Sequence, residues 1–134
     1  MYALGRDIAP DCHSGSNALC AQIRAAAVGT SVDADLLIAI ATQESGLNPQ
    51  AVGDQGHSVG LYQEHDAGRG AGLSAAQRQD VAAATQRAAR EVLATIQANP
   101  RADPGTIAVL AQRPREDLRP AYVAAVNRQY AAFK

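Results

Sequence analysis

Large aromatic side chains are scarce in this sequence of 134 residues, which has no tryptophan, one phenylalanine and only 4% aromatic residues. Hydrophobic residues still make up 47% of the chain, and alanine supplies much of that fraction. Because alanine is the best helix former, the composition predicts closely packed helices rather than a sheet. The length fits one domain with its own core, so we expect residues 1–134 to form a single domain.

An excess of charge of one sign is also missing, since twelve Lys and Arg are interspersed with thirteen Asp and Glu, for a net charge of −1. Nucleic-acid-binding domains normally carry a basic face, so we expect no nucleic-acid partner. Apolar runs such as 36–41 are far shorter than the ~20 residues that span a bilayer, which predicts no membrane insertion. The start, MYALGRDIAPDCHSG, has no apolar segment of a secretory signal peptide. We therefore expect export by another route, or a chain trimmed of its leader.

Cysteine is limited to Cys12 and Cys20, which is too few for a disulfide framework. The sequence is compatible both with a bridge between them and with two free thiols. Only Cys12 and His13 are adjacent as metal ligands, and His57 and His65 lie far along the chain, so zinc-site spacing is lacking. We expect no metal and no cofactor.

Helical patterns cover most of the chain after an irregular start. The clearest is TSVDADLLIAIATQESG, in which Ser31 is the predicted N-cap, Asp33 and Asp35 suit the positive end of the helix dipole, and Gly46 ends the helix. Capping and proline signals predict the others: 16–28, a short helix from Ser74, 80–98 after the cap Asp80, 106–112 after Asp103-Pro104, and a last helix from Pro120. Five or six helices are expected.

The segment LNPQAVGDQGHSVGLYQEH differs, because its proline and three glycines forbid a helix. We expect short extended pieces around a turn at 54–56, as a small hairpin. If 58–63 is extended, Val59, Leu61 and Gln63 share one face and the alternate residues the other. A flexible stretch, DAGRGAG, follows. The predicted fold class is therefore α+β, mostly α, with five to six helices and a small irregular hairpin lobe.

Glu44 is the residue that chemistry singles out. Leu36, Leu37 and Ile40 lie eight, seven and four positions before it, so it continues the apolar stripe of its helix. It also stands in the last turn, where the helix dipole opposes a carboxylate. Both effects should raise its pKa, and a carboxylic acid kept protonated near neutral pH is typical of glycosidases. The alternative is a glutamate that simply turns to solvent at the helix end.

The stretch ESGLNPQAVGDQGHSVGLYQ resembles the signature of goose-type lysozymes and soluble lytic transglycosylases, especially their bacteriophage versions. That signature joins a helix-ending Glu-Ser, an Asn-Pro-x-Ala turn and a Gly-Leu-x-Gln strand, which here are Glu44-Ser45, Asn48-Pro49-Gln50-Ala51 and Gly60-Leu61-Tyr62-Gln63. Chance agreement of three blocks in order and spacing is improbable. Weaker similarity continues through LSAAQ and the helix after Asp80.

The resemblance implies a lysozyme-like fold whose groove holds the alternating N-acetylglucosamine and N-acetylmuramic acid of peptidoglycan. It implies that Glu44 is the general acid, with Ser45 and Gln63 lining the sugar site. The glycine-bearing loop suits a backbone that approaches a bound glycan chain, which adds further expected substrate contacts at Ser58, Gly60 and Tyr62.

Two departures from the family pattern stand out. The family's Ala-Tyr-Asn-Ala-Gly segment is missing. Its nearest counterpart is Ala121-Tyr122, and by this counterpart the resemblance implies that Tyr122 orients Glu44. Glu64 stands where an apolar residue is usual.

The resemblance leaves two chemistries open. A lytic transglycosylase needs no second carboxylate, because the 6-hydroxyl of the muramic sugar closes an anhydro ring. An inverting lysozyme needs a base that holds water, for which Asp54 and Asp66 are the candidates, although each also fits an ordinary turn or solvated residue. His57 and His65 flank the same loop as further, weaker candidates for substrate contact.

We expect transglycosylation by a monomer that acts on the bacterial wall, as a phage lysin or a virion-associated enzyme. A non-catalytic wall-binding or virion structural module of the same fold is the alternative, but binding alone does not need the acid.

Overall fold

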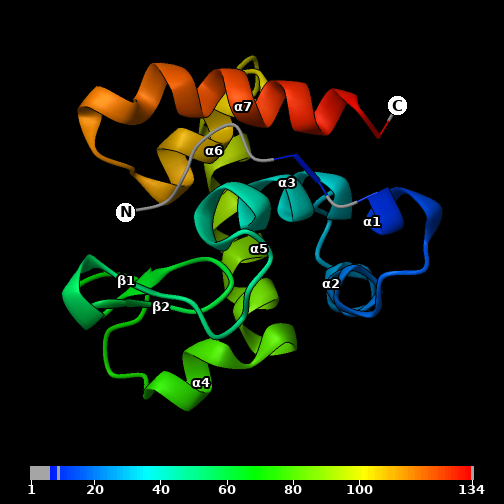
Figure 1. The fold of residues 1–134 in the computed structure, drawn as a ribbon. Helices are drawn as coiled ribbons and strands as arrows, with labels where there is room; N and C mark the ends of the chain where they lie inside the picture. Colours follow the sequence, from blue (N-terminus) through cyan, green and yellow to red (C-terminus); the bar gives the residue numbers. More distant parts are fainter. Residues whose placement is uncertain (1–6, 9, 134) are drawn as a thin grey trace.

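The computed structural model describes residues 7–8 and 10–133. Within this part of the chain, helices predominate (Figure 1), in the order α1 (Pro10–Ser14), α2 (Ala18–Ala27), α3 (Ala34–Ser45), α4 (Ala75–Gln79), α5 (Val81–Ala98), α6 (Pro104–Gln112) and α7 (Arg119–Ala131). The strands are β1 (Val52–Gly53), β2 (Ser58–Val59) and β3 (Glu64–His65), and the 3-10 helices are η1 (Asp54–Gly56) and η2 (Glu116–Leu118). The predicted class, α+β and mostly α, is confirmed.

The described part has seven α-helices rather than five or six, because the N-terminal segment predicted to be irregular contains α1. Proline suits the first turn of a helix, where its missing N–H costs nothing, and Pro10 begins α1. A disulfide between Cys12 and Cys20, with 5.6 Å between their Cα atoms, ties α1 to α2. The alternative of two free thiols is therefore wrong, and the cysteines are not available as metal ligands.

Helix α3 lies at the centre of the fold, with α2 and α7 packed against it, and its residues from Leu36 to Glu44 are all buried. The predicted N-cap, Ser31, is wrong: it lies outside the helix with φ of 65°. Asp33 adjoins the first helical residue, and its carboxylate accepts the N–H of Asp35 at 2.9 Å. The predicted C-terminus is confirmed, since Gly46 adopts the left-handed conformation with φ of 66°. These two ends place Glu44 in the last turn.

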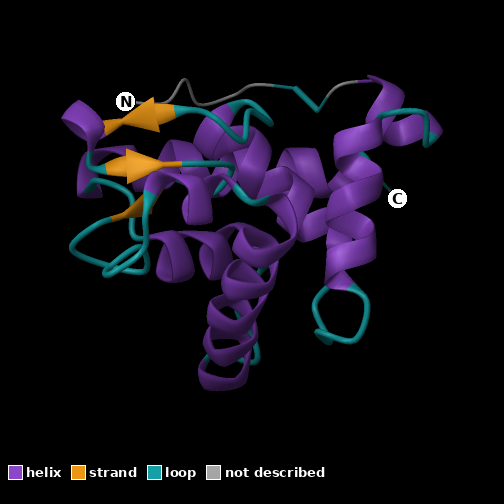
Figure 2. Ribbon diagram, turned by 90° about the horizontal axis from the view of Figure 1, so that it is seen from below, coloured by secondary structure: helices purple, strands orange, loops and turns teal. Residues whose placement is uncertain are grey.

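The predicted hairpin is part of a three-stranded antiparallel sheet, β1-β2-β3, beside α4 (Figure 2). Val59 pairs with both Val52 and Glu64, and Ser58 pairs with both Gly53 and His65. We refer to residues 51–65 as the sheet lobe.

The extended conformation considered for 58–63 holds only for β2, because residues 60–63 form the turn between β2 and β3. Positive φ angles of 95° at Gly60 and 51° at Gln63 reverse the chain there. Two-sided alternation is lost as a result, and Leu61 and Tyr62 are both buried although they are neighbours. A side chain at Gly60 is also excluded by packing, because its Cβ would lie 2.2 Å from the carbonyl oxygen of Arg78 in α4.

The remaining helices begin close to where their capping signals predict. Ser74 and Gln77 form the predicted capping box of α4, and Asp80 caps α5, which ends at Ala98 as expected. Helix α6 begins two residues earlier than predicted, at Pro104, and the last helix begins at Arg119. The stretch 66–72, predicted to be flexible, is a series of hydrogen-bonded turns. In the described residues, no helix combines the length and apolar character needed to cross a bilayer.

Candidate active site

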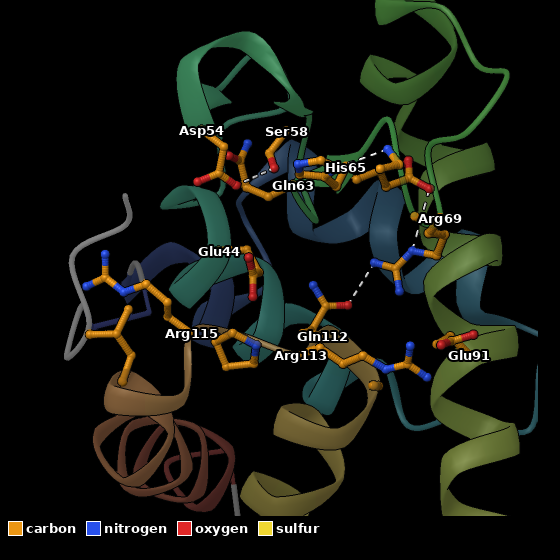
Figure 3. Close-up of a pocket in the computed structure, with 16 residues that line it drawn as sticks. Glu44, Asp54, Ser58, Gln63, His65, Arg69, Glu91, Gln112, Arg113 and Arg115 are labelled. Atoms are coloured by element: carbon orange, nitrogen blue, oxygen red, sulfur yellow. Dashed lines mark hydrogen bonds and ion pairs between the residues drawn. The ribbon is translucent and has the colours of Figure 1, made fainter.

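A pocket of about 450 Å³ opens beside the last turn of α3 (Figure 3). The sheet lobe and the turns that follow it form one side, and α5 together with the end of α6 and the segment after it forms the other. Its lining consists of Glu44, Asp54, Ser58, Gln63, Glu64, His65, Ala67, Gly68, Arg69, Glu91, Ala111, Gln112, Arg113, Pro114, Arg115 and Leu118. Figure 3 shows Glu44 in the middle, between the lobe residues and Gln112.

Glu44 is 6% exposed, and its side chain is held from α7, far along the chain. The hydroxyl of the fully buried Tyr122 donates a hydrogen bond to Glu44 Oε2 at 2.5 Å. Burial raises the pKa of Glu44 to about 7, as its place on the apolar stripe predicts. Hydrogen bonding with Tyr122 and Gln112 and the charge of Arg69 lower this pKa, while the charge of Asp54 raises it. A carboxyl of this kind can give up a proton near neutral pH and take one back.

Three of the predicted site residues reach the pocket from the sheet lobe. Asp54 Oδ2 accepts a hydrogen bond of 2.6 Å from the hydroxyl of Ser58. The amide nitrogen of Gln63 donates to the carbonyl oxygens of Ala51 and Gly60, at 3.1 and 3.0 Å. The lobe therefore presents hydrogen-bonded polar side chains to the pocket from η1, β2 and the turn after β2.

The other predicted substrate contacts do not line the pocket. Ser45 donates to the carbonyl oxygen of Leu61 at 2.8 Å, so it fastens the lobe to α3. Gly60 packs against α4, and Tyr62 is fully buried with its hydroxyl hydrogen bonded to Thr85 at 2.9 Å. Tyr122 is not part of the lining, and its hydroxyl donates a hydrogen bond to Glu44, which is.

The second candidate for a water-holding base, Asp66, lies outside the pocket lining. Its carboxylate is 2.8 Å from Nδ1 of His57, and this contact is the main reason that its pKa is lowered. His65 lines the pocket and stacks on His57, with 5.6 Å between ring centroids. No group of three or more metal-ligating side chains with the geometry of a metal site occurs among residues 7–8 and 10–133.

The structure adds pocket residues that sequence reasoning missed. Arg69 comes from the glycine-rich turns, and Glu91 and Gln112 come from α5 and α6. No local spacing marks these three residues. Glu64 had a signal, since it stands where the family has an apolar residue, and its side chain proves to be fully buried against Arg87 and Arg69.

Comparison with known families identifies the family of this chain. The model of the family described as transglycosylase SLT domain matches residues 21–109, which is more than half of the chain. This chain belongs to the transglycosylase SLT family. Searches among curated proteins and among solved structures gave no match.

As an SLT domain, the chain is a peptidoglycan enzyme of the lytic transglycosylase and muramidase type. The match spans Glu44 and the whole sheet lobe of the SLT domain, but it ends before Gln112 and Tyr122. The contact of Gln112 with Glu44 is therefore known from the structure alone, whereas the contact of Tyr122 with Glu44 agrees with the orienting role that the resemblance implies.

Proposed function

We propose that this SLT domain cleaves the β-1,4 bond between N-acetylmuramic acid and N-acetylglucosamine, that Glu44 is its general acid, and that the chemistry is transglycosylation. One observation carries the proposal: a buried carboxyl faces the pocket with its pKa raised to about 7. At neutral pH a large share of such carboxyls hold a proton, which an ordinary glutamate does not.

In the first step, Glu44 donates its proton to the glycosidic oxygen while the bond to the muramic C1 breaks and positive charge develops on that sugar. In the second step, the Glu44 carboxylate takes the proton of the same sugar's 6-hydroxyl, and that oxygen bonds to C1 to close the 1,6-anhydro ring. The acid is regenerated, and no water is consumed. The hydroxyl of Tyr122, 2.5 Å from Oε2, suits the carboxylate formed between the two steps.

Tyr122→Phe is expected to move the alkaline limb of the pH–activity profile to higher pH, by about one unit, and to slow lysis about tenfold. The Tyr122 hydroxyl favours the ionised form of Glu44, so its loss raises the pKa of that carboxyl. Lysis of purified peptidoglycan between pH 4 and 9 measures both effects. Tyr130→Phe, on the same helix, is the control, because the Tyr130 hydroxyl bonds Asp33 instead. An unmoved limb in Tyr122→Phe would refute the assigned contact.

Asp54→Asn and Asp66→Asn are each expected to keep lysis within about tenfold of the parent, because positioning is affected but no proton transfer is lost. Asp54 is held by Ser58, and Asp66 is an exposed partner of His57, so neither is needed to explain the site. Mass analysis of the released muropeptides should find anhydro ends in parent and variants. Reducing ends, with a loss in Asp54→Asn comparable to that in Glu44→Gln, would instead indicate a lysozyme with Asp54 holding water.

We also propose that residues 1–134 work as one monomeric catalytic domain on the bacterial wall, as a phage lysin or a virion-associated enzyme. The support is the resemblance of the Glu44–Gln63 blocks to bacteriophage versions of the signature. Sedimentation at several concentrations tests the monomer. Lysis of an expressing host only when a holin is co-expressed would favour the lysin, and lysis independent of a holin would count against it.

A further inference from the structure

A buried ion-pair network forms part of the wall of the pocket. The carboxylate of Glu64, in β3, is fully buried and accepts two hydrogen bonds from Arg87 of α5, at 2.7 and 2.8 Å. Arg69 adds a second guanidinium, with its Nε 3.6 Å from Glu64 Oε2. One carboxylate thus faces two permanent cations, and its two hydrogen bonds with Arg87 make Arg87 its main partner. The network retains about one positive charge, which resides on Arg69.

Arg69 carries that charge to the pocket. Its side chain is 17% exposed and lines the cavity, and its terminal nitrogen donates to Gln112 Oε1 at 2.7 Å. Gln112 in turn donates to the carbonyl oxygen of Tyr62 at 3.0 Å, which fixes the amide. Arg69 Nε is buried without a hydrogen bond, so the charge of Glu64 and the Gln112 contact hold the guanidinium in place. Figure 3 shows Gln112 between Arg69 and Glu44.

We propose that Arg69, held by Glu64 and Gln112, is a positioning residue for the reaction, whose charge stabilises the carboxylate that Glu44 becomes when it donates its proton. The inference rests on the proposed role of Glu44 as the acid. It also gives Glu64 a function, since an apolar residue at that position would leave Arg69 without its buried partner.

The other groups around Glu44 do not supply this charge. Tyr122 and Gln112 are neutral, and Asp54 from η1 is of the opposite sign. Arg115 is paired with Asp117, and both side chains are more than half exposed, so solvent screens them. The remaining charged groups of the lining are Arg113, which is exposed, the half-buried Glu91, and His65 in the lobe. Arg69 is the cation that favours the ionised form of Glu44.

The opposing effects of burial and of the Arg69 charge matter because Glu44 must first donate a proton and then accept one. Burial alone disfavours the carboxylate that Glu44 becomes in the first step. Glu44 must nevertheless stay ionised until it takes the proton of the 6-hydroxyl. A fixed cation near the buried carboxyl favours that carboxylate without reorganisation during the reaction. Arg69 is therefore expected to affect the proton donation of the first step and the protonation of the free enzyme, rather than glycan binding.

The test is the pH profile of kcat/KM for lysis of peptidoglycan, together with an NMR titration of the Glu44 carboxyl carbon. Arg69→Gln should move the alkaline limb and the NMR midpoint upward by at least about half a unit. Arg69→Lys should restore both to the parent's positions, since it retains the charge. Arg90→Gln is the matched control, because Arg90 is exposed on α5 and outside the pocket lining.

Glu64→Gln should have the opposite effect, because it leaves two guanidinium groups without a counter-charge and so favours ionised Glu44. The alkaline limb of its pH profile and the NMR midpoint of its Glu44 should both move to lower pH. If this variant does not fold, the Arg69 variants decide.

An Arg69→Gln midpoint equal to the parent's, or an Arg69→Lys midpoint that follows Arg69→Gln, overturns the inference. Failure of the proposed function is distinct, since it would show as full activity in Glu44→Gln whatever the Arg69 variants do.

Discussion

Glu44→Gln is expected to lower peptidoglycan lysis by about 10²–10⁴-fold, which is the contribution of a positioned general acid. The amide has the shape of the acid and can still receive the Tyr122 hydroxyl bond, but it has no proton to give to the glycosidic oxygen. Turbidity loss of a peptidoglycan suspension measures the rate, and circular dichroism checks that the fold is kept. Activity within about tenfold of the parent would contradict the assignment and would favour a site that needs no acid.

The same variant should show a pH-dependent gain in stability. The folded parent keeps the Glu44 proton up to about pH 7, whereas an unfolded glutamate releases it near 4.5. Between these values the folded state binds more protons, so the parent's free energy of unfolding falls as pH rises. The pKa shift of Glu44 between the unfolded and folded states corresponds to roughly 3 kcal/mol in the free energy of unfolding. Glutamine does not titrate, so its stability should match the parent's near pH 4 and exceed it at pH 8.

Urea denaturation of both proteins at pH 4, 6 and 8 measures that difference. Because all other titrating groups are common to the two proteins, the difference between their curves isolates Glu44. A constant difference across the range would mean that Glu44 titrates as an ordinary glutamate in the folded state.

Gly60→Ala is expected to destabilise the fold by about 2–5 kcal/mol, from a left-handed backbone and from overpacking. Gly60 has φ of 95°, and its added Cβ would lie 2.2 Å from the carbonyl oxygen of Arg78. Because that oxygen belongs to backbone, the sheet lobe must move away from α4. Lysis should fall as well, since the lobe carries Asp54, Ser58 and Gln63 into the pocket.

Gly56→Ala is a matched control for this variant. Gly56 has nearly the same φ, 96°, but an added Cβ would meet nothing within 4 Å. It should therefore cost only the backbone contribution, about 1–2 kcal/mol. Thermal and urea unfolding of the two alanine variants separate the two contributions. Equal losses would show that close packing against α4 does not stabilise the lobe.

Features that depend on neighbours along the chain could be predicted from the sequence. Glu44 falls on the apolar stripe of α3 because helical spacing alone returns it to the face of Leu37 and Ile40, and burial of that face raises its pKa. The capping box at Ser74 and the glycine end of α3 are likewise local signals, each satisfied within a few residues. The family signature followed from the same short blocks.

Local signals also account for the errors. Ser31 and Asp33 are both good N-caps, but Ser31 has a left-handed backbone with φ of 65°, and it is the Asp33 side chain that accepts the N–H of Asp35 at the start of α3. Residues 58–63 alternate as a strand would, but Gly60 must turn the chain to pass Arg78 in α4. At Gly60 a contact with another element overrides the local preference.

The tertiary structure decided what surrounds the acid, except for Tyr122, which the family resemblance had already linked to Glu44. Tyr122 lies 78 residues from Glu44 along the chain, Gln112 lies 43 from Arg69, and Arg87 lies 23 from Glu64. Contacts over such separations follow from how α5, α6 and α7 pack around α3, and no spacing within one element encodes them. The sequence by itself determined that a carboxyl ends a buried helix. Packing determined which hydroxyl, amide and guanidinium lie beside it, because a charge or hydrogen bond acts over a few ångströms of space and not along the chain.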